Sequence, residues 1–353
     1  MSKKMCNFVA TYCVHVHERE KRQNMKLSII TINYNNAEGL CKTLASVAAQ
    51  TYPNIEHIIV DGGSTDGSVD VIREYESPLA SSLSPFASSL KWLSEPDKGI
   101  YNAMNKGIEI ALRRRIVNDD HTSQPILNPS LEGRTSVHEE REETELGSHY
   151  IQILNSGDIL AAHDVTELMF SSLKETLPFR EGNGVGLFYG NMIKEYPDGR
   201  RVKDMCGGRD YTPESFYYFY RGTLNHDCAY IRKDLFEKYG LYNEELKICS
   251  DWEWYVRAIV LGEEKPVYTN IDVTVFDMTG ISESDGKNKE LIKKERREYL
   301  ESILPVAVLR DYDMLSLPIE QYRRLKKYHL WGIVYFLERV LFKFEKWQNK
   351  LKR

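Results

Sequence analysis

Polar side chains follow four apolar segments of this chain, at the points where each segment ends. They supply amides, carboxylates, a hydroxyl, an aromatic ring and a cation: Thr31, Asn33, Tyr34, Asp61, Asp97, Lys98, Asn155 and Asp158. A ring can stack on a nucleotide base, an amide or a carboxylate can pair with the edge of the base, and a carboxylate can hold a divalent cation beside phosphates. These residue types together predict a nucleotide site with a metal ion.

One of the carboxylates stands in the stretch HYIQILNSGDIL, residues 149–160. Its first half is apolar, as in a buried strand, and it then changes abruptly to Asn155-Ser156-Gly157-Asp158. One interpretation is a turn, because Asp and Gly favour turns and Asp158 could cap the segment that follows. The other is that the strand holds a carboxylate out for a metal ion. The stretch alone leaves both interpretations open.

The elements that must position these side chains are four short apolar runs. They predict strands buried on both faces: 27–32, 55–61, 91–95 and 150–154. Helical patterns follow the first three, so the sequence predicts an α/β fold with a mostly parallel central sheet flanked by helices. Because ligands bind beyond the carboxyl ends of parallel strands, the polar side chains should converge there. Neither GxGxxG nor GxxxxGK[ST] occurs, which argues against a dinucleotide fold and a P-loop.

The second half of the chain is more mixed. We expect a hairpin over 187–203, a strand and a helix over 228–240, a helix over 250–262 and a strand over 267–277. Two segments fall outside the pattern: residues 1–24, which precede the first strand, are expected to be a disordered extension, and the polar residues 116–149 a disordered surface insertion. The sequence therefore predicts a core domain over 25–285 and a helical region over 286–353.

Composition narrows the class of protein. The net charge of −5 argues against a general nucleic-acid binder. Six cysteines without a CxxC pair fit the reduced thiols of a cytosolic protein. No run of 18 apolar residues and no signal-peptide cleavage pattern is present, so we expect no spanning helix and a cytoplasmic location.

The C-terminal segment 318–353 has a different character. It contains ten lysines and arginines against three glutamates. Apolar residues recur in it at helical spacing: Leu330, Ile333, Val334, Leu337, Val340, Leu341, Phe344, Trp347 and Leu351. A basic amphipathic helix with aromatic residues favours contact with an anionic membrane, here the inner face of the cell membrane. The alternative is a helix that packs on the core domain or on a second copy of the chain.

Five motifs in order give the chain a resemblance to a known family. SIITINYNN, IIVDGGSTDGS, SEPDKGIYNAMNKGI, YIQILNSGD and the segment from NHDCAYIRKD to SDWEW resemble those of the non-processive family 2 glycosyltransferases that build bacterial capsule, O-antigen and exopolysaccharide. The resemblance spans roughly residues 26–280. It implies a GT-A fold, a nucleotide-sugar donor (a UDP-sugar foremost), a divalent Mg²⁺ or Mn²⁺, and inversion at the anomeric carbon. It also implies a glycan or lipid-linked acceptor.

The resemblance assigns roles residue by residue. Asp61 matches the carboxylate that contacts the base, and Thr31, Asn33 and Tyr34 match nucleotide contacts of the first strand. Asp97 and Lys98 fall in the segment near the base and phosphates. Asp158 matches the last acid of the metal-binding DxD-type motif, whose first acid is here replaced by Asn155, so metal binding without donor should be weak. His226 and Trp252 would lie in the acceptor or diphosphate region.

Asp251 matches the family's general base. A first-turn position on a helix lowers the pKa of a carboxyl group, whereas burial beside aromatic residues raises it. Glu253 is two residues further on and should point to another face, so we expect Asp251 to be the base.

Three alternative functions fit the sequence to different degrees. The missing first acid and the long insertion keep open a non-catalytic relative that binds nucleotide-sugar or scaffolds a polysaccharide assembly. A nucleotidyltransferase would need a Gly-rich basic loop after the first strand, and NYNNAEG lacks the cations. A processive enzyme is disfavoured because QxxRW is absent.

Overall fold

The computed structural model describes residues 25–77, 90–112, 126–127, 148–176, 185–204, 213, 215–278 and 286–351. The expected extension over 1–24 lies outside the described residues, as does the expected insertion over 116–149 except for residues 126–127 and 148–149. The chain forms two units, Met1–Glu295 and Arg296–Arg353, which are described separately below.

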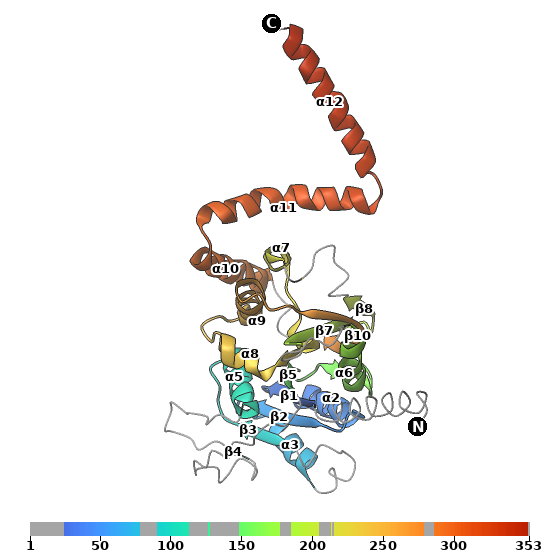
Figure 1. Ribbon diagram of the computed structural model, residues 1–353. Coiled ribbons are helices and arrows are strands. Elements are labelled where there is room, and N and C mark those ends of the chain that lie inside the picture. Colours follow the sequence, from blue (N-terminus) through green and yellow to red (C-terminus); the bar gives the residue numbers. More distant parts are fainter. Residues whose placement is uncertain are drawn as a thin grey trace, which may run out of the picture. The chain divides into compact units, whose positions relative to one another are not determined.

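A single ten-stranded sheet organises the described part of the first unit (Figure 1). Its order is β4-β3-β2-β1-β5-β9-β7-β10-β6, with β8 paired to β7. The strands are β1 (Lys26–Asn33), β2 (Ile55–Asp61), β3 (Lys91–Ser94), β4 (Ile126–Leu127), β5 (His149–Ile153), β6 (Ile159–Leu160), β7 (Leu187–Glu195), β8 (Arg201–Asp204), β9 (Ala229–Arg232) and β10 (Val267–Asp277).

Strands β3, β2, β1 and β5 form a parallel block, as the four apolar runs predict. Helices α2 (Ala37–Ala48) and α3 (Ser68–Glu76) cover one face, where they bury a cluster of Leu40, Leu44, Ile59, Ile72, Leu90 and Trp92. Helix α5 (Ile100–Ala111) covers the opposite face. Gly107 of α5 lies directly on Ile30, and a Cβ atom there would collide with that side chain. Burial on both faces explains why these strands read as continuous apolar runs.

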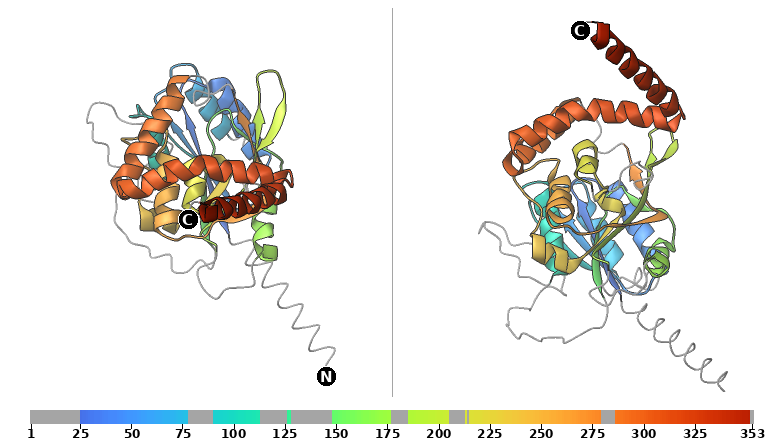
Figure 2. Two further views of the ribbon diagram at one scale, coloured as in Figure 1. Left: turned by 90° about the horizontal axis from the view of Figure 1, so that it is seen from above. Right: turned by 45° about the horizontal axis from the view of Figure 1, so that its top comes forward.

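The second half of the sheet is mixed. Strand β9 runs antiparallel to both β5 and β7, while β7 and β10 are parallel. The hairpin β7–β8 confirms the one predicted over 187–203 and stands out in yellow-green in Figure 2. Strand β4, inside the expected insertion, pairs antiparallel with β3. The α/β class with parallel block and flanking helices is thus confirmed.

The remaining helices of this unit lie around the second half of the sheet. They are α6 (Val165–Thr176), α7 (Phe216–Arg221), the 3-10 turn η2 (His226–Cys228), α8 (Lys233–Tyr239), α9 (Ser250–Tyr255), the π-helical segment η3 (Val256–Leu261) and the start of α10 (Gly286–Ile303). The helix predicted over 250–262 therefore changes from α to π geometry at Val256, a change that is frequent near functional sites.

The second unit consists of the end of α10, α11 (Val306–Lys327) and α12 (Trp331–Leu351). Arg297 forms an ion pair of 2.9 Å with Asp313. Residues 328–330 interrupt the helix expected over 318–353, where His329 has a φ of 57°, and the rings of Tyr322 and Trp331 meet edge to face across this break. Within the described ranges, we find no helix with the length and apolarity needed to cross a membrane.

At the amino ends of the parallel strands, a buried carboxylate ties three of them together. Glu56 of β2 forms ion pairs with Lys26 of β1 (3.2 Å) and Lys91 of β3 (2.6 Å), and Ser28 donates to it at 2.7 Å. Burial raises the pKa of Glu56, but the two lysines outweigh it and lower that pKa to about 2.

We expect Glu56→Gln to reduce the free energy of unfolding by about 3 kcal/mol at pH 7, the value that corresponds to this pKa shift. Because the pKa of Glu56 is depressed in the folded state, its contribution is complete above the ordinary carboxyl range of about 4.5. It is lost as the pH falls toward 2. Urea unfolding at pH 7 and pH 3 measures this; an equal difference at both pH values would contradict it.

Candidate active site

Backbone hydrogen bonds bring the turns after the parallel strands to one edge of the sheet. Gly62 donates to Asn33 at 2.9 Å, Glu95 to Asp61 at 3.0 Å, and Ser156 to Ile32 at 3.0 Å. The parallel register places Asn33 opposite Asp61 and Asp61 opposite Ser94. The predicted convergence of polar residues at this edge therefore has a direct structural cause.

Asp61 is the centre of the first group of side chains at this edge. Its carboxylate is fully buried and accepts from Asn33 Nδ2 at 2.8 Å, from the backbone and hydroxyl of Ser64 at 2.9 and 2.5 Å, and from Ser94 Oγ at 2.7 Å. Those donors occupy both carboxylate oxygens. Asp61 therefore fixes the shape of the loop 61–64 and the orientation of the Asn33 amide.

An accessible surface lies beside this network. The ring of Tyr34 is 64% exposed. Gly62 lies between the Tyr34 ring and the carboxylate of Asp97. A Cβ atom on Gly62 would collide with Asp97 Oδ2 and would lie 3.1 Å from the Tyr34 ring, so only glycine leaves room here. Burial raises the pKa of Asp97, and a hydrogen bond from the Gly99 amide at 2.8 Å opposes this. An exposed ring next to a half-buried carboxylate is a combination that can stack on a base and pair with its edge.

The turn after β1 joins this group to the turn after β5. Asn36 Oδ1 accepts from the amide of Gly39 at 3.1 Å and so caps α2, while Asn36 Nδ2 donates to the carbonyl of Ser156 at 3.1 Å. The backbone N–H of Asn35 donates to Ser64 Oγ at 2.8 Å. Asn36 thus fixes the position of the NSGD turn relative to β1.

A second group of side chains starts at Asn155. Its Nδ2 atom lies 3.3 Å from His226 Nε2, and His226 Nδ1 lies 3.2 Å from Asp251 Oδ2. Asp251 Oδ1 in turn lies 3.2 Å from the hydroxyl of Tyr101, which also donates to the carbonyl of Ile248 at 2.5 Å. The side chains of His226 and Asp251 are 18% and 14% exposed. A carboxylate, an imidazole and an amide therefore form one chain from α9 to the end of β5.

The carboxylates around His226 favour the protonated, positively charged form of its imidazole. Burial lowers its pKa, but the hydrogen bond and charge of Asp251, with the charges of Asp227 and Asp158, raise the pKa of His226 to about 9. Both imidazolium nitrogens then donate, so the Asn155 amide must offer its oxygen to Nε2. Asn155 Oδ1, which is buried and has no partner in the other amide orientation, is thereby satisfied.

Asp158 lies in a crowded, buried acidic environment. It is 4% exposed, and its Oδ1 accepts from the backbone amide of Asp277 at 2.9 Å. Burial raises the pKa of Asp158 well above its usual range, and the charge of Asp227 adds to this effect. The described residues contain no group of three or more His, Cys, Asp or Glu side chains arranged to hold a metal ion.

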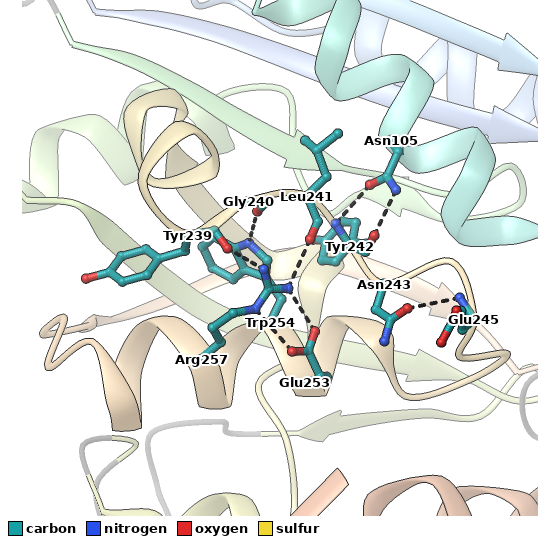
Figure 3. Close-up of polar contacts among 10 residues, drawn as sticks. All are labelled: Asn105, Tyr239, Gly240, Leu241, Tyr242, Asn243, Glu245, Glu253, Trp254 and Arg257. Carbon is teal, nitrogen blue, oxygen red and sulfur yellow. Dashed lines mark hydrogen bonds and ion pairs between the residues drawn. The ribbon is translucent and has the colours of Figure 1, made fainter. Parts of the chain in front are cut away.

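Glu253, the other acid of the SDWEW segment, faces away from this chain, as its spacing predicts. Arg257 binds both of its carboxylate oxygens, at 3.1 and 2.8 Å (Figure 3). The same guanidinium donates to the carbonyls of Tyr239 and Leu241, so Glu253 and Arg257 hold the turn that precedes α9. Glu253 is therefore engaged structurally, whereas Asp251 points to the strand ends.

Three of the candidate residues lie apart from these groups. Thr31 is fully buried and its hydroxyl lies 2.9 Å from His57 Nε2, in the interior between β1 and β2. Trp252 is 1% exposed and donates to the carbonyl of Phe219 at 2.8 Å. Lys98 is exposed at the start of α5, where its amide donates to Asn102 Oδ1 at 3.2 Å. Their predicted contacts with ligand remain predictions.

Sequence reasoning did not single out several residues that shape the site. They are Asn36, Ser64, Ser94, Tyr101, Asp227 and Asp277. All of them except Asp277 stand inside the five motifs that carry the family resemblance, and that is the one signal that marks them. Nothing in residue type distinguishes the two serines from ordinary turn formers.

Comparison with known proteins identifies what the fold and this edge resemble. The model of the family Glycosyl transferase family 2 matches residues 28–122, which include β1 to β3, α5 and the Asp61 network. An uncharacterized glycosyltransferase of Mycobacterium tuberculosis is 28% identical over 258 residues, covering 72% of this chain and 76% of that protein. A PGL/p-HBAD biosynthesis glycosyltransferase of Mycobacterium bovis is 22% identical over 267 residues, covering 76% of this chain and 82% of that protein.

Among solved structures, the fold is similar to S. aureus TarS 1–349 in complex with UDP-GlcNAc. The TM-score is 0.52 at 16% sequence identity, over 80% of this chain and 69% of that one. A second comparison is with TarS 1–349 in complex with UDP, where the TM-score is 0.49 at 17% sequence identity. The match covers 72% of this chain and 61% of the length of that TarS chain. The likeness to the UDP-GlcNAc complex confirms the GT-A fold expected from the sequence.

Proposed function

We propose that this chain is a family 2 glycosyltransferase that transfers one sugar from a UDP-sugar to a hydroxyl of a glycan or lipid-linked acceptor, with inversion at the anomeric carbon. The match of residues 28–122 to the family model and the likeness of the fold to TarS 1–349 support this proposal. One observation supports this above the others. Asp251, 14% exposed, reaches the strand ends through His226 and Asn155, with contacts of 3.2 and 3.3 Å. A carboxylate placed there suits proton removal from an acceptor hydroxyl.

The two groups of side chains divide the work. Tyr34, Asp61 and Asp97 contact the base, and the hydrogen bonds of Asp61 with Asn33, Ser64 and Ser94 fix the loop at this edge. The positive charge of the His226 imidazolium, whose two N–H groups are bonded to Asn155 and Asp251, stabilises the phosphate oxygens of the donor. Asp251 accepts the proton of the attacking hydroxyl, and a single displacement at the anomeric carbon then inverts its configuration.

The metal proposal depends on the chemistry of the acids around the NSGD turn. Asp158 offers a carboxylate whose ionisation is costly without a cation, and Asp277 lies beside it, with its Oδ2 atom 3.8 Å from the position of a Cβ atom on Gly157. This set fits Mg²⁺ or Mn²⁺, because such ions take one or two protein carboxylates and complete their shell with phosphates and water. The ion would supply charge to stabilise the diphosphate as it leaves.

An enzyme assay tests the proposal. The full chain with Mn²⁺ or Mg²⁺ would be incubated with UDP-, GDP- and dTDP-sugars, and the release of nucleotide diphosphate followed with and without a bacterial lipid extract. We expect lipid-stimulated release from a UDP-sugar, lost on chelation with EDTA. Binding of a donor without turnover under any acceptor condition would instead favour a non-catalytic scaffold, and binding of none would contradict both functions.

We also propose that α12 contacts an anionic membrane surface at the cytoplasmic side. Its apolar residues are exposed in the structure, among them Ile333, Phe336, Leu337, Leu341 and Trp347. Arg339, Lys343 and Lys346 form a basic stripe along one flank of these apolar residues, at helical spacing. Such a helix lies in the interface with its apolar face in the acyl boundary.

We expect the full chain to sediment with vesicles of phosphatidylglycerol and phosphatidylcholine but not with phosphatidylcholine alone. Replacing Lys343 and Lys346 together by Glu should reduce binding at least tenfold, since each basic residue contributes about 1 kcal/mol near such a surface. Replacing the exposed Lys42 and Lys265 of the first unit by Glu changes the net charge equally and serves as the control. An equal loss in both pairs would argue against a specific α12 contact.

A further inference from the structure

Asp251 stands in the first turn of α9, a helix whose N-terminus no side chain of its own caps. The backbone amides ahead of this helix are nevertheless bonded. Glu295 of α10 accepts from Lys247 at 2.8 Å, from Ile248 at 3.1 Å and from Cys249 at 3.0 Å. A carboxylate 44 residues further along the chain therefore occupies the amides that lead into the helix of the proposed base.

The carboxylate is built into the interior. Glu295 is 6% exposed, and among the described residues no lysine, arginine or histidine forms an ion pair with it. The thiol of Cys249 lies 3.7 Å from the carbonyl of Ile292, one turn before Glu295. The negative charge of Glu295 is balanced by the three peptide dipoles, which makes those hydrogen bonds strong and directional.

The same segment is held from its other side by α5. The carbonyl of Ile248 accepts from the Tyr101 hydroxyl at 2.5 Å, and that hydroxyl lies 3.2 Å from Asp251 Oδ1. Ile248 thus has its amide bound to Glu295 and its carbonyl bound to Tyr101. A displacement of segment 247–249 would move the start of α9 and with it the Asp251 carboxylate.

We infer that Glu295 is a positioning residue for the reaction: it fixes segment 247–249, and its charge offsets the positive end of α9 so that Asp251 stays basic. A helix N-terminus stabilises an ionised carboxylate and so weakens it as a base. Glu295 accepts from the amides of residues 247–249 directly ahead of α9, so a second negative charge lies at this end of the helix. The inference rests on the proposed function, in which Asp251 is the general base.

Other titratable groups also face Asp251 and set the background for a pH test. His226 contacts it from η2 and Tyr101 from α5. Tyr242, in the turn before α9, and Tyr255, within α9, interact with its charge. Glu295→Gln changes none of these, so a shift of the pH profile in that variant reports the Glu295 charge.

The experiment compares Glu295→Gln and Glu295→Asp with Glu290→Gln, a matched control on the exposed side of the same helix, where Glu290 pairs with Lys293 at 2.7 Å. We expect Glu295→Gln to lower kcat about ten- to one-hundred-fold, the effect of a displaced catalytic group, with unchanged KM for donor. In the pH profile of kcat, the acid limb of Glu295→Gln should lie about half a pH unit below that of wild type. Glu295→Asp should lower kcat without moving the limb.

Amide hydrogen exchange gives a readout that needs no turnover. Peptides covering 247–255 should exchange faster in both Glu295 variants than in Glu290→Gln and wild type. If Glu295→Gln does not fold, Glu295→Asp carries the test through its exchange and its kcat. Behaviour identical to Glu290→Gln, or a fall in kcat with no shift of the limb in Glu295→Gln, would overturn the inference. Wild-type chain without turnover counts against the proposed function alone, and the exchange result still decides whether Glu295 fixes the segment.

Discussion

Asp251→Asn is expected to lower kcat for sugar transfer by about 10²–10⁴-fold, the contribution of a general base, while the Kd for donor changes less than threefold. The amide keeps the shape of the carboxylate and its place between His226 and Tyr101. It cannot accept the acceptor's proton. Single-turnover transfer, with donor binding measured by calorimetry, separates the two quantities.

A control and a second readout sharpen this prediction. Asp198→Asn, at the exposed tip of the β7–β8 hairpin, makes the same chemical change and should leave kcat unaltered. The imidazole of His226 should titrate with a pKa of about 9 in wild type. In Asp251→Asn the pKa of His226 should fall toward or below its usual range, because burial still lowers it and the charge of Asp251 no longer raises it. Retention of transfer in Asp251→Asn, with the expected fall in the His226 pKa, would remove Asp251 from the base role.

The His226–Asp251 pair also affects stability. Because the pKa of His226 is raised in the folded state, its contribution is complete below about 6.5, the ordinary value, and is lost as the pH rises through about 9. Asp251→Asn should therefore be less stable than wild type at pH 6, and the difference should narrow at pH 10.

The parallel half of the fold was predictable because burial on both faces leaves a simple signature. LSIITI and IEHIIVD contain no alternation, and their ends mark the edge where Asn33 and Asp61 meet. The pattern locates the end of a strand but not the direction of each side chain. Thr31, two residues before Asn33, faces inward to His57. Strand β4 has two residues, too few to form any pattern.

The second group of the site could not be derived from local sequence. Asp251 meets Tyr101 across 150 positions and His226 across 25. Those contacts depend on β9 turning antiparallel between β5 and β7, which places η2 at the end of β5. Resemblance to a family predicted Asp251 and His226. The residues that hold them in place could be identified only from the packing in the structure. Glu295 shows this most clearly, since nothing in GKNKELIKKERREYL marks one glutamate as buried.

Asp158→Asn is expected to separate activity from stability. Metal-dependent turnover of the donor should fall at least a hundredfold, because a divalent ion contributes several kcal/mol to stabilising a departing diphosphate. Without metal, the free energy of unfolding of Asp158→Asn should equal or exceed that of wild type. The carbonyl oxygen of the new amide can still accept from the Asp277 backbone N–H, as the carboxylate does in wild type. The substitution also removes a carboxyl group whose ionised form is disfavoured, because burial and the charge of Asp227 raise its pKa.

Thermal unfolding with and without Mn²⁺ and UDP tests both halves of this prediction. Wild type should gain stability when the two ligands are added together and little from Mn²⁺ alone, since a single carboxylate without donor phosphates binds the ion weakly. Asp158→Asn should lose the joint gain, and Asp198→Asn should retain it. A variant that loses turnover together with several kcal/mol of stability would indicate that Asp158 serves the fold. Undiminished Mn²⁺-dependent turnover would move the metal site away from the NSGD turn.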